Sequence, residues 1–129
     1  MTRKAFAQLV HQAVAALPAA GRGAIENVAF VLEDKARRRK TREVGIRRDE
    51  ILLGLYEGVP KTKRGSGYFG VLPDKITLFR DPIRELAGSD PEKLRRLIQD
   101  VVWHEVGHHL GFDEPAIRAL EQKRKKRYN

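Results

Sequence analysis

The chain has 129 residues, of which 41% are hydrophobic, so we expect one folded domain over residues 1–129 rather than a disordered protein. It contains no cysteine, which excludes disulfides and thiolate metal sites and leaves histidine and carboxylate as metal ligands. The net charge of +9 makes nucleic acid a possible partner. The positive charges are concentrated in the basic segments Lys35–Arg42, Lys61–Arg64 and Lys123–Arg127. Solvated loops are the simpler interpretation of these segments, because no aromatic residues are interleaved with the charges.

The amino-terminal region is predicted to be a helix rather than a secretion signal. Gln8, His11 and Gln12 interrupt its apolar run, whereas hydrophobic residues recur at helical spacing between Thr2, a capping residue, and Leu17. No stretch of the sequence is long and apolar enough to span a membrane. We therefore expect a cytoplasmic protein, and the 33% charged content with few Asn and Gln also favours a heat-stable one.

Three segments have the composition of β-strands, namely Asn27–Glu33, Ile51–Glu57 and Lys75–Arg80. The connections Asp34–Asp49 and Lys61–Gly70 are charged or rich in glycine, so both are expected to be flexible surface loops. Asp81 and Pro82 bound the third strand, and a short helix is predicted over Ile83–Ala87.

A long helix is predicted between Asp90 and Gly111. Asp90 is a favourable capping residue and Pro91 suits the first helical turn. Apolar residues follow at helical spacing up to Gly111, which can turn the chain back in the left-handed conformation. Pro115 suits the first turn of a last helix, from Ala116 to about Lys125.

His104, Glu105 and His108 form the zinc-binding pattern His-Glu-x-x-His in the last turns of this long helix. Histidines four residues apart return to nearly the same helix face, where two imidazoles can converge on one zinc ion. Glu105 is about 100° further around the helix, which suits a general base acting on a zinc-activated water. His109 is interpreted as a packing or supporting residue, because it lies about 140° from His104.

The string His104-Glu105-x-x-His108-x-x-Gly111, followed by an acidic pair, resembles the zincin-like metallopeptidases and, more narrowly, the small single-domain bacterial minimal zincins. The resemblance implies an α+β fold in which a small twisted three-stranded sheet packs against the zinc-bearing helix, with additional helices. It also implies a zinc metallopeptidase that binds one zinc ion per chain, with His104 and His108 as ligands and Glu105 as the base.

The likeness to the minimal zincins extends upstream to Leu53–Pro60 and to Ile76–Arg80. By analogy, the strand at residues 75–80 would be the sheet edge that faces an extended peptide substrate. The residues expected to contact that substrate are therefore Ile76, Thr77, Leu78 and Phe79. The methionine turn of larger relatives is absent, because the only methionine is Met1.

The third zinc ligand has two candidates. The family pattern places it ten positions after the first histidine, which is Glu114 in this chain. The usual residue at that position in the small family is aspartate, and Asp113 stands one position earlier. Glu114 is preferred by its register, while Asp113 is the rival ligand or a residue that orients one.

Two aromatic side chains are expected to be structural. Trp103 directly precedes the first histidine and is predicted to belong to the core. Tyr56 is interpreted as a strand residue in preference to a donor that stabilises an oxyanion.

Other functions remain open. The string His-x-x-x-His-x-x-Gly-Phe-Asp also resembles the bacterial zinc endoribonucleases of ribosomal RNA maturation, but Glu114 replaces their third histidine and Glu105 stands where their pattern has glycine. A further interpretation is a non-catalytic zinc domain that binds nucleic acid through its basic loops. The preferred prediction is a peptide or protein substrate, with an accessory protein as a possible partner because so small a fold leaves little from which to build specificity pockets.

Overall fold

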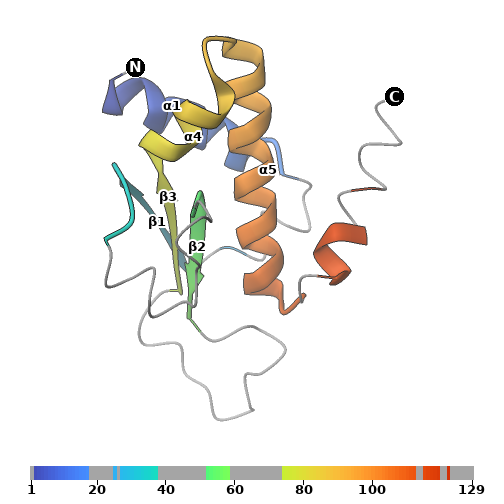
Figure 1. Cartoon of the computed structure of the whole chain (residues 1–129). Coiled ribbons are helices and arrows are strands. Elements are labelled where there is room, and N and C mark those ends of the chain that lie inside the picture. The colour runs from blue at the N-terminus through green and yellow to red at the C-terminus, as the bar shows by residue number, and fades with distance from the viewer. Residues whose placement is uncertain are drawn as a thin grey trace.

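The computed structural model describes residues 2–17, 25, 27–37, 52–58, 74–112, 115–119 and 122. They form an α+β fold in which a three-stranded sheet packs against helices (Figure 1). The elements, in chain order, are α1 Arg3–Ala15, β1 Val28–Glu33, β2 Gly54–Glu57, β3 Asp74–Phe79, α4 Arg80–Ala87 and α5 Pro91–Leu110. Residues 115–119 are also helical. The predicted loop Lys61–Gly70 lies outside the described residues.

The sheet is mixed, with the strand order β1-β3-β2. β1 runs parallel to β3 and places Phe30 opposite Ile76, whereas β2 runs antiparallel to β3 and places Tyr56 opposite the same residue. The prediction that residues 75–80 form the edge of the sheet is therefore wrong, because β3 is the central strand. The physical reason is burial: four successive residues of β3 are at most 2% exposed, as expected of a strand covered on both faces.

This order also corrects the predicted substrate-contacting residues. A peptide can extend a sheet only at a strand whose backbone N–H and C=O groups are not already used by neighbours on both sides. β3 pairs with β1 along one side and with β2 along the other. The edge contact with a peptide that was predicted for Ile76, Thr77, Leu78 and Phe79 is thus excluded by the sheet order.

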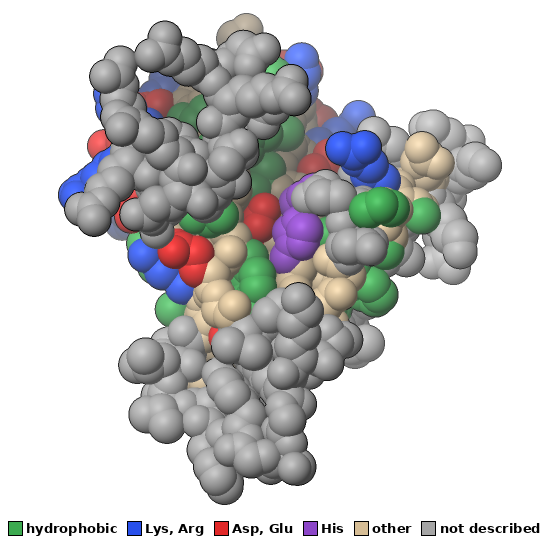
Figure 2. Space-filling view, turned by 60° about the horizontal axis from the view of Figure 1, so that its bottom comes forward, with side chains coloured by type: hydrophobic (Ala, Val, Ile, Leu, Met, Phe, Trp, Pro, Cys, Tyr) green, Lys and Arg blue, Asp and Glu red, His purple; other side chains and the backbone are tan. Residues whose placement is uncertain are grey.

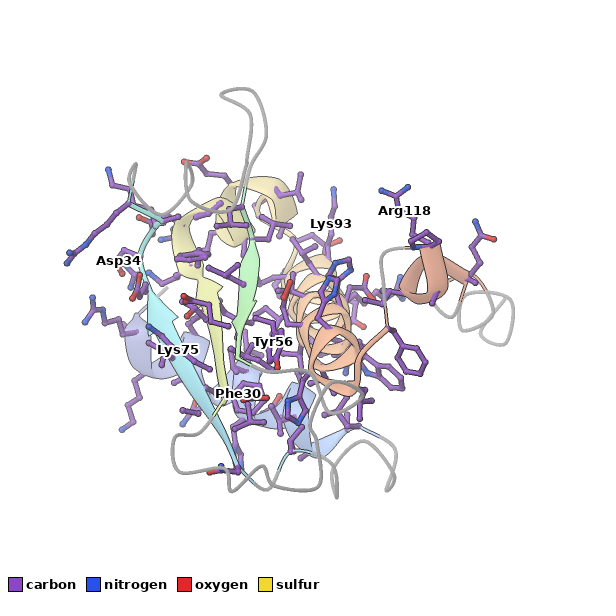
Figure 3. The ribbon with its side chains drawn as sticks, turned by 90° about the horizontal axis from the view of Figure 1, so that it is seen from below. Phe30, Asp34, Tyr56, Lys75, Lys93 and Arg118 are labelled. Carbon is purple, nitrogen blue, oxygen red and sulfur yellow. The ribbon has the colours of Figure 1, made fainter. Side chains whose placement is uncertain are left out.

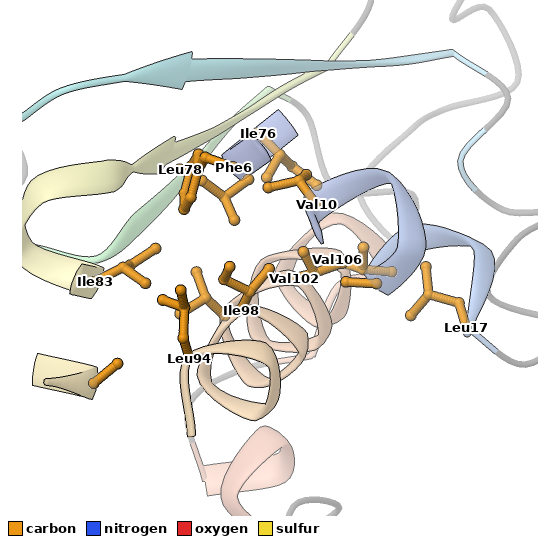
Figure 4. Close-up of a cluster of buried hydrophobic side chains, with 13 residues drawn as sticks. Phe6, Val10, Leu17, Ile76, Leu78, Ile83, Leu94, Ile98, Val102 and Val106 are labelled. Atoms are coloured by element: carbon orange, nitrogen blue, oxygen red, sulfur yellow. The ribbon is translucent and has the colours of Figure 1, made fainter. Parts of the chain in front are cut away.

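The hydrophobic core lies between the sheet and the helices (Figure 4). From β3, Ile76 and Leu78 point toward α1 and α5, where Phe6, Val10 and Val102 meet them. Burying one such aliphatic or aromatic side chain stabilises a fold by about 1.5–3 kcal/mol. The predicted apolar stripe of the long helix is confirmed by the buried residues of α5, which include Leu94, Ile98, Val101, Val102 and Val106. This packing makes α5 a rigid support for the histidines near its end.

The predicted helix caps are confirmed. Thr2 Oγ1 accepts a hydrogen bond from the Ala5 amide over 3.1 Å, and Asp90 Oδ1 accepts one from the Glu92 amide over 3.0 Å. α4 begins three residues earlier than predicted, because Pro82 occupies its first turn, where a missing amide hydrogen costs nothing. Among the described residues, no helix is both long enough and apolar enough to cross a membrane.

The connection after β1 begins with an anchored residue. Asp34 Oδ1 lies 3.1 Å from a terminal guanidinium nitrogen of Arg80, and the Asp81 amide donates to the Asp34 carbonyl over 2.9 Å. A longer contact of 3.4 Å joins Asp34 to Arg3 at the start of α1. These contacts join the ends of β1 and β3. The later part of the predicted flexible loop, residues 38–49, lies outside the described residues.

Candidate metal centre

His104 and His108 lie one turn apart near the end of α5, as their spacing predicted. Their ring centroids are 5.0 Å apart and the ring planes cross at 72°. One ligand atom from each histidine and one carboxylate oxygen of Glu105 all lie within 4.8 Å of one another. Figure 2 shows histidine side chains at the surface, with an acidic side chain and hydrophobic side chains beside them. The fold therefore brings together the three residues of the predicted pattern at a place that a ligand can reach.

The donor chemistry of this cluster fits zinc. Zinc takes histidine nitrogen and carboxylate oxygen at about 2.0–2.2 Å, and catalytic sites use three protein ligands with an open fourth position. Within the part of the chain that the structure describes, His104, Glu105 and His108 are the only group of three or more such residues that meets this proximity. Asp113 and Glu114 lie outside the described residues, so the identity of the third ligand stays a prediction.

The side chain of Glu105 lies against the backbone of β2. It is 7% exposed, and a Cβ atom placed on Gly54 would lie 3.2 Å from Glu105 Cγ. The same added atom would lie 2.6 Å from Val101 Cγ1, one turn earlier on α5. β2 and α5 can approach this closely because residue 54 has no side chain. The result is a carboxylate that is held next to two imidazoles and largely shielded from bulk water. Electrostatic interactions are stronger in such a shielded place than in water.

The chain reverses direction directly after α5. Gly111 has φ +98°, the left-handed conformation that was predicted for it, and its amide donates to the His108 carbonyl over 3.0 Å. The Phe112 amide donates to the Gly107 carbonyl over 3.0 Å. Farther along, Ile117 is 3% exposed and packs against Gly107, with its Cγ1 3.0 Å from where a Cβ at position 107 would be.

The helical residues 115–119 lie on the side of α5 away from the sheet (Figures 1 and 3). Phe112, before Asp113 and Glu114, and Ile117, after them, thus both contact Gly107, which precedes the ligand candidate His108 in the chain.

A buried polar cluster lies behind the histidine pair, and local sequence patterns contain little sign of it. His109 is 1% exposed and donates from Nδ1 to Asp74 Oδ2 over 2.6 Å. Tyr56 points from β2 toward α5 and donates its hydroxyl hydrogen to the same oxygen over 2.8 Å (Figure 3). The Tyr56 and His109 rings meet edge to face with centroids 5.7 Å apart. The three residues are far apart in sequence, and the only sequence signal was a histidine off the ligand face of the helix.

This cluster agrees with two structural expectations. His109 is buried, as expected of a packing or supporting residue. The Tyr56 hydroxyl is directed to Asp74, which supports the interpretation of this residue as part of the strand framework. Trp103, predicted to be core, is partly buried and packs against the hydrophobic cluster.

Comparison with known proteins agrees with the fold. A family model described as zincin-like metallopeptidase matches residues 25–124, a range that includes the whole sheet and α5. A solved structure of a conserved hypothetical protein from Thermus thermophilus is similar, with a TM-score of 0.58 and 24% sequence identity over 84% of this chain and 94% of that chain. At that identity the likeness concerns the fold alone. No curated protein matches the chain.

Proposed function

This chain belongs to the zincin-like metallopeptidase family, and we propose that it hydrolyses peptide bonds with one zinc ion held by His104 and His108. The observation that carries the proposal is the position of Glu105 with these two histidines on one rigid helix, with all three donor atoms within 4.8 Å of one another. The family implies zinc, and the donor set present in the structure is one that zinc takes.

Glu105 is proposed as the general base. Zinc bound at the histidine pair would supply Lewis acidity, which polarises a scissile carbonyl and lowers the pKa of water. The Glu105 carboxylate lies within reach of the same position and would accept the proton of the attacking water and pass it to the leaving amine. Contact with the backbone at Gly54 restricts this side chain, so its carboxylate is held in place before the substrate binds.

Glu114 is proposed as the third protein ligand, with Asp113 as the alternative. Support comes from described residues before and after them in the chain, because the Phe112 amide and the Ile117 side chain both contact Gly107. Both candidates thus lie in the chain between residues that contact the turn of α5 carrying His108. Zinc affinity measured on Glu114→Ala and Asp113→Ala distinguishes the two, and an unchanged affinity in Glu114→Ala would refute our choice.

The strand nearest the site suggests how a peptide would bind. Among the described strands, β2 is an edge of the sheet, and its first residue, Gly54, lies next to Glu105. We propose that an extended substrate aligns with β2, where main-chain hydrogen bonds provide affinity without deep side-chain pockets. An accessory protein that adds specificity remains part of this proposal.

Bound zinc per chain, measured after metal loading and desalting, tests the metal site. Native protein should retain close to one zinc, and His108→Ala should retain none, since a single remaining imidazole and a carboxylate do not complete the site. Absence of zinc from the native protein would contradict the proposal. The same zinc-loaded protein should also be given RNA, because cleavage of RNA without cleavage of peptides would favour the endoribonuclease alternative.

A further inference from the structure

We propose that Asp74 is a positioning residue for the metal centre, which fixes the last turn of α5 through His109 and is itself held by Tyr56. The inference rests on the proposed zinc site at His104 and His108. It adds a role for a carboxylate on a different element, at the first residue of β3. That carboxylate is no member of the described metal-ligand cluster, which comprises His104, Glu105 and His108.

Asp74 is a junction between three strands and the helix. Its Oδ2 accepts from both the Tyr56 hydroxyl of β2 and the Nδ1 of His109 on α5, over 2.8 and 2.6 Å. Its amide donates to the Asn27 carbonyl, just before β1, over 3.1 Å. The Asp74 side chain is 2% exposed, so these hydrogen bonds operate with little competition from water.

The backbone next to Asp74 is shaped to admit its carboxylate. A Cβ atom on Gly58 would lie 2.4 Å from Asp74 Oδ1, and the φ of Gly58 is +156°, a value that L-residues rarely adopt. A side chain at position 58 would therefore displace Asp74. The close fit restricts the carboxylate to one place, so its direction toward His109 is well defined.

The bond to His109 acts on a part of the helix that needs support. The final turn of a helix has fewer backbone hydrogen bonds than its interior and tends to fray, and in α5 the Gly111 and Phe112 amides bond to the carbonyls of His108 and Gly107. This turn carries His108, whose neighbour His109 points about 100° away around the helix and is 1% exposed. By anchoring His109 to the sheet, Asp74 fixes the backbone of His108 and hence the distance between the two imidazoles proposed to bind zinc.

Zinc affinity tests this role. If Asp74 only stabilised the fold, replacing it would not change the zinc affinity at temperatures where the protein is fully folded. Asp74→Ala removes the shared acceptor, and we expect the zinc dissociation constant to rise about tenfold, at the low end of the range for residues that support metal ligands. With cobalt in place of zinc, the visible absorption bands of Asp74→Ala should broaden and shift, because the ligand geometry is less fixed.

Three further variants control the comparison. Asp74→Asn keeps an oxygen that can accept both hydrogen bonds and should recover most of the affinity. Tyr56→Phe keeps the ring against His109, removes the hydroxyl that donates to Asp74, and should weaken zinc binding less than Asp74→Ala. It also tests the role if Asp74→Ala does not fold. Ile83→Val, a change in the core at α4, should lower thermal stability without altering zinc affinity.

If Asp74→Ala folds, native zinc affinity and native cobalt spectra in this variant would overturn the positioning role. If it does not fold, native zinc affinity in Tyr56→Phe would overturn that role. Either result would leave the zinc site itself intact. An Asp74→Asn protein as weak as Asp74→Ala would overturn the hydrogen-bond explanation. Failure of the native protein itself to bind zinc would overturn the proposed function, and the positioning role with it. The two proposals therefore fail on different samples.

Discussion

The α-carbon of Gly54 in β2 faces the side chain of Glu105 in α5 so closely that a Cβ at position 54 would lie 3.2 Å from Glu105 Cγ. The same atom would lie 2.6 Å from Val101 Cγ1, a distance that real Cβ atoms essentially never show. Gly54 is the first residue of β2, and its lack of a side chain permits the close approach of helix and sheet. The proposed base is thereby packed against the strand that we propose as the peptide-binding edge.

Gly54→Ala should therefore destabilise the protein and displace Glu105. Overpacking of this kind costs about 1–3 kcal/mol in the free energy of unfolding, which chemical denaturation measures. Combining it with Val101→Ala removes the atom nearest the new methyl group, so the double variant should lose less stability than the sum of the single variants. Strictly additive losses would show that the two residues do not meet as described.

Gly107→Ala should raise the zinc dissociation constant while changing the free energy of unfolding little. Replacing a helix-interior glycine with alanine gains about 0.5–1 kcal/mol of helix stability, but the new Cβ would lie 3.0 Å from Ile117 Cγ1 and push residues 115–119 away from α5. If the intervening segment supplies the third ligand, the zinc dissociation constant rises. Adding Ile117→Ala removes both Cγ1 and Cδ1, the atoms nearest the new methyl group, and should restore the affinity. Equal zinc binding in native and Gly107→Ala proteins would contradict this link.

Glu92 should make stability depend on pH at the start of α5. The hydrogen bond from Arg95, together with the charges of Arg95 and Arg96, lowers the pKa of Glu92 from its ordinary value of 4.5. A carboxyl group whose pKa is lower in the folded state stabilises the fold above its unfolded pKa, and this contribution disappears as the pH falls through the folded value.

The stability difference between native protein and Glu92→Gln should accordingly be constant well above the ordinary pKa of 4.5 and shrink as the pH falls through and below it. The group is fully exposed, so the difference should be small and should diminish in high salt. Denaturant unfolding at several pH values measures it, and a difference that grows on acidification would contradict the assignment.

Zinc should raise the melting temperature, because a ligand that binds only the folded state stabilises it by mass action. Free zinc at 100 times the dissociation constant adds about 2.7 kcal/mol, which for a domain of this size is a shift of several degrees. A chelator should reverse the shift. His108→Ala should melt at the same temperature with and without zinc; an equal shift in that variant would mean that zinc binds elsewhere.

Local sequence patterns predicted the elements and the histidine pair well, because both depend on residues close in sequence. The cap at Asp90, the apolar stripe of α5 and the left-handed Gly111 all follow from spacing within one helix. His104 and His108 come together for the same reason. Such features require no knowledge of how distant parts of the chain pack.

Relationships between distant residues were not predictable in this way. The central place of β3 follows from burial on both faces, which a short alternating strand does not reveal. Asp74 directly precedes the predicted strand Lys75–Arg80 and had no predicted role, yet it joins Tyr56 and His109, which are 18 and 35 residues away. The role of Gly54 likewise depends on Glu105, on another element.

Peptide hydrolysis by Glu105→Gln, compared with native protein at equal zinc occupancy, tests the central claim most directly. The substitution keeps the size of the side chain and leaves the two histidines unchanged, but an amide cannot accept the proton of the attacking water. We predict that the variant binds zinc as the native protein does and loses turnover by a factor of about 10²–10⁴. Turnover by the zinc-loaded variant at the native rate would contradict the role of Glu105 and the mechanism built on it.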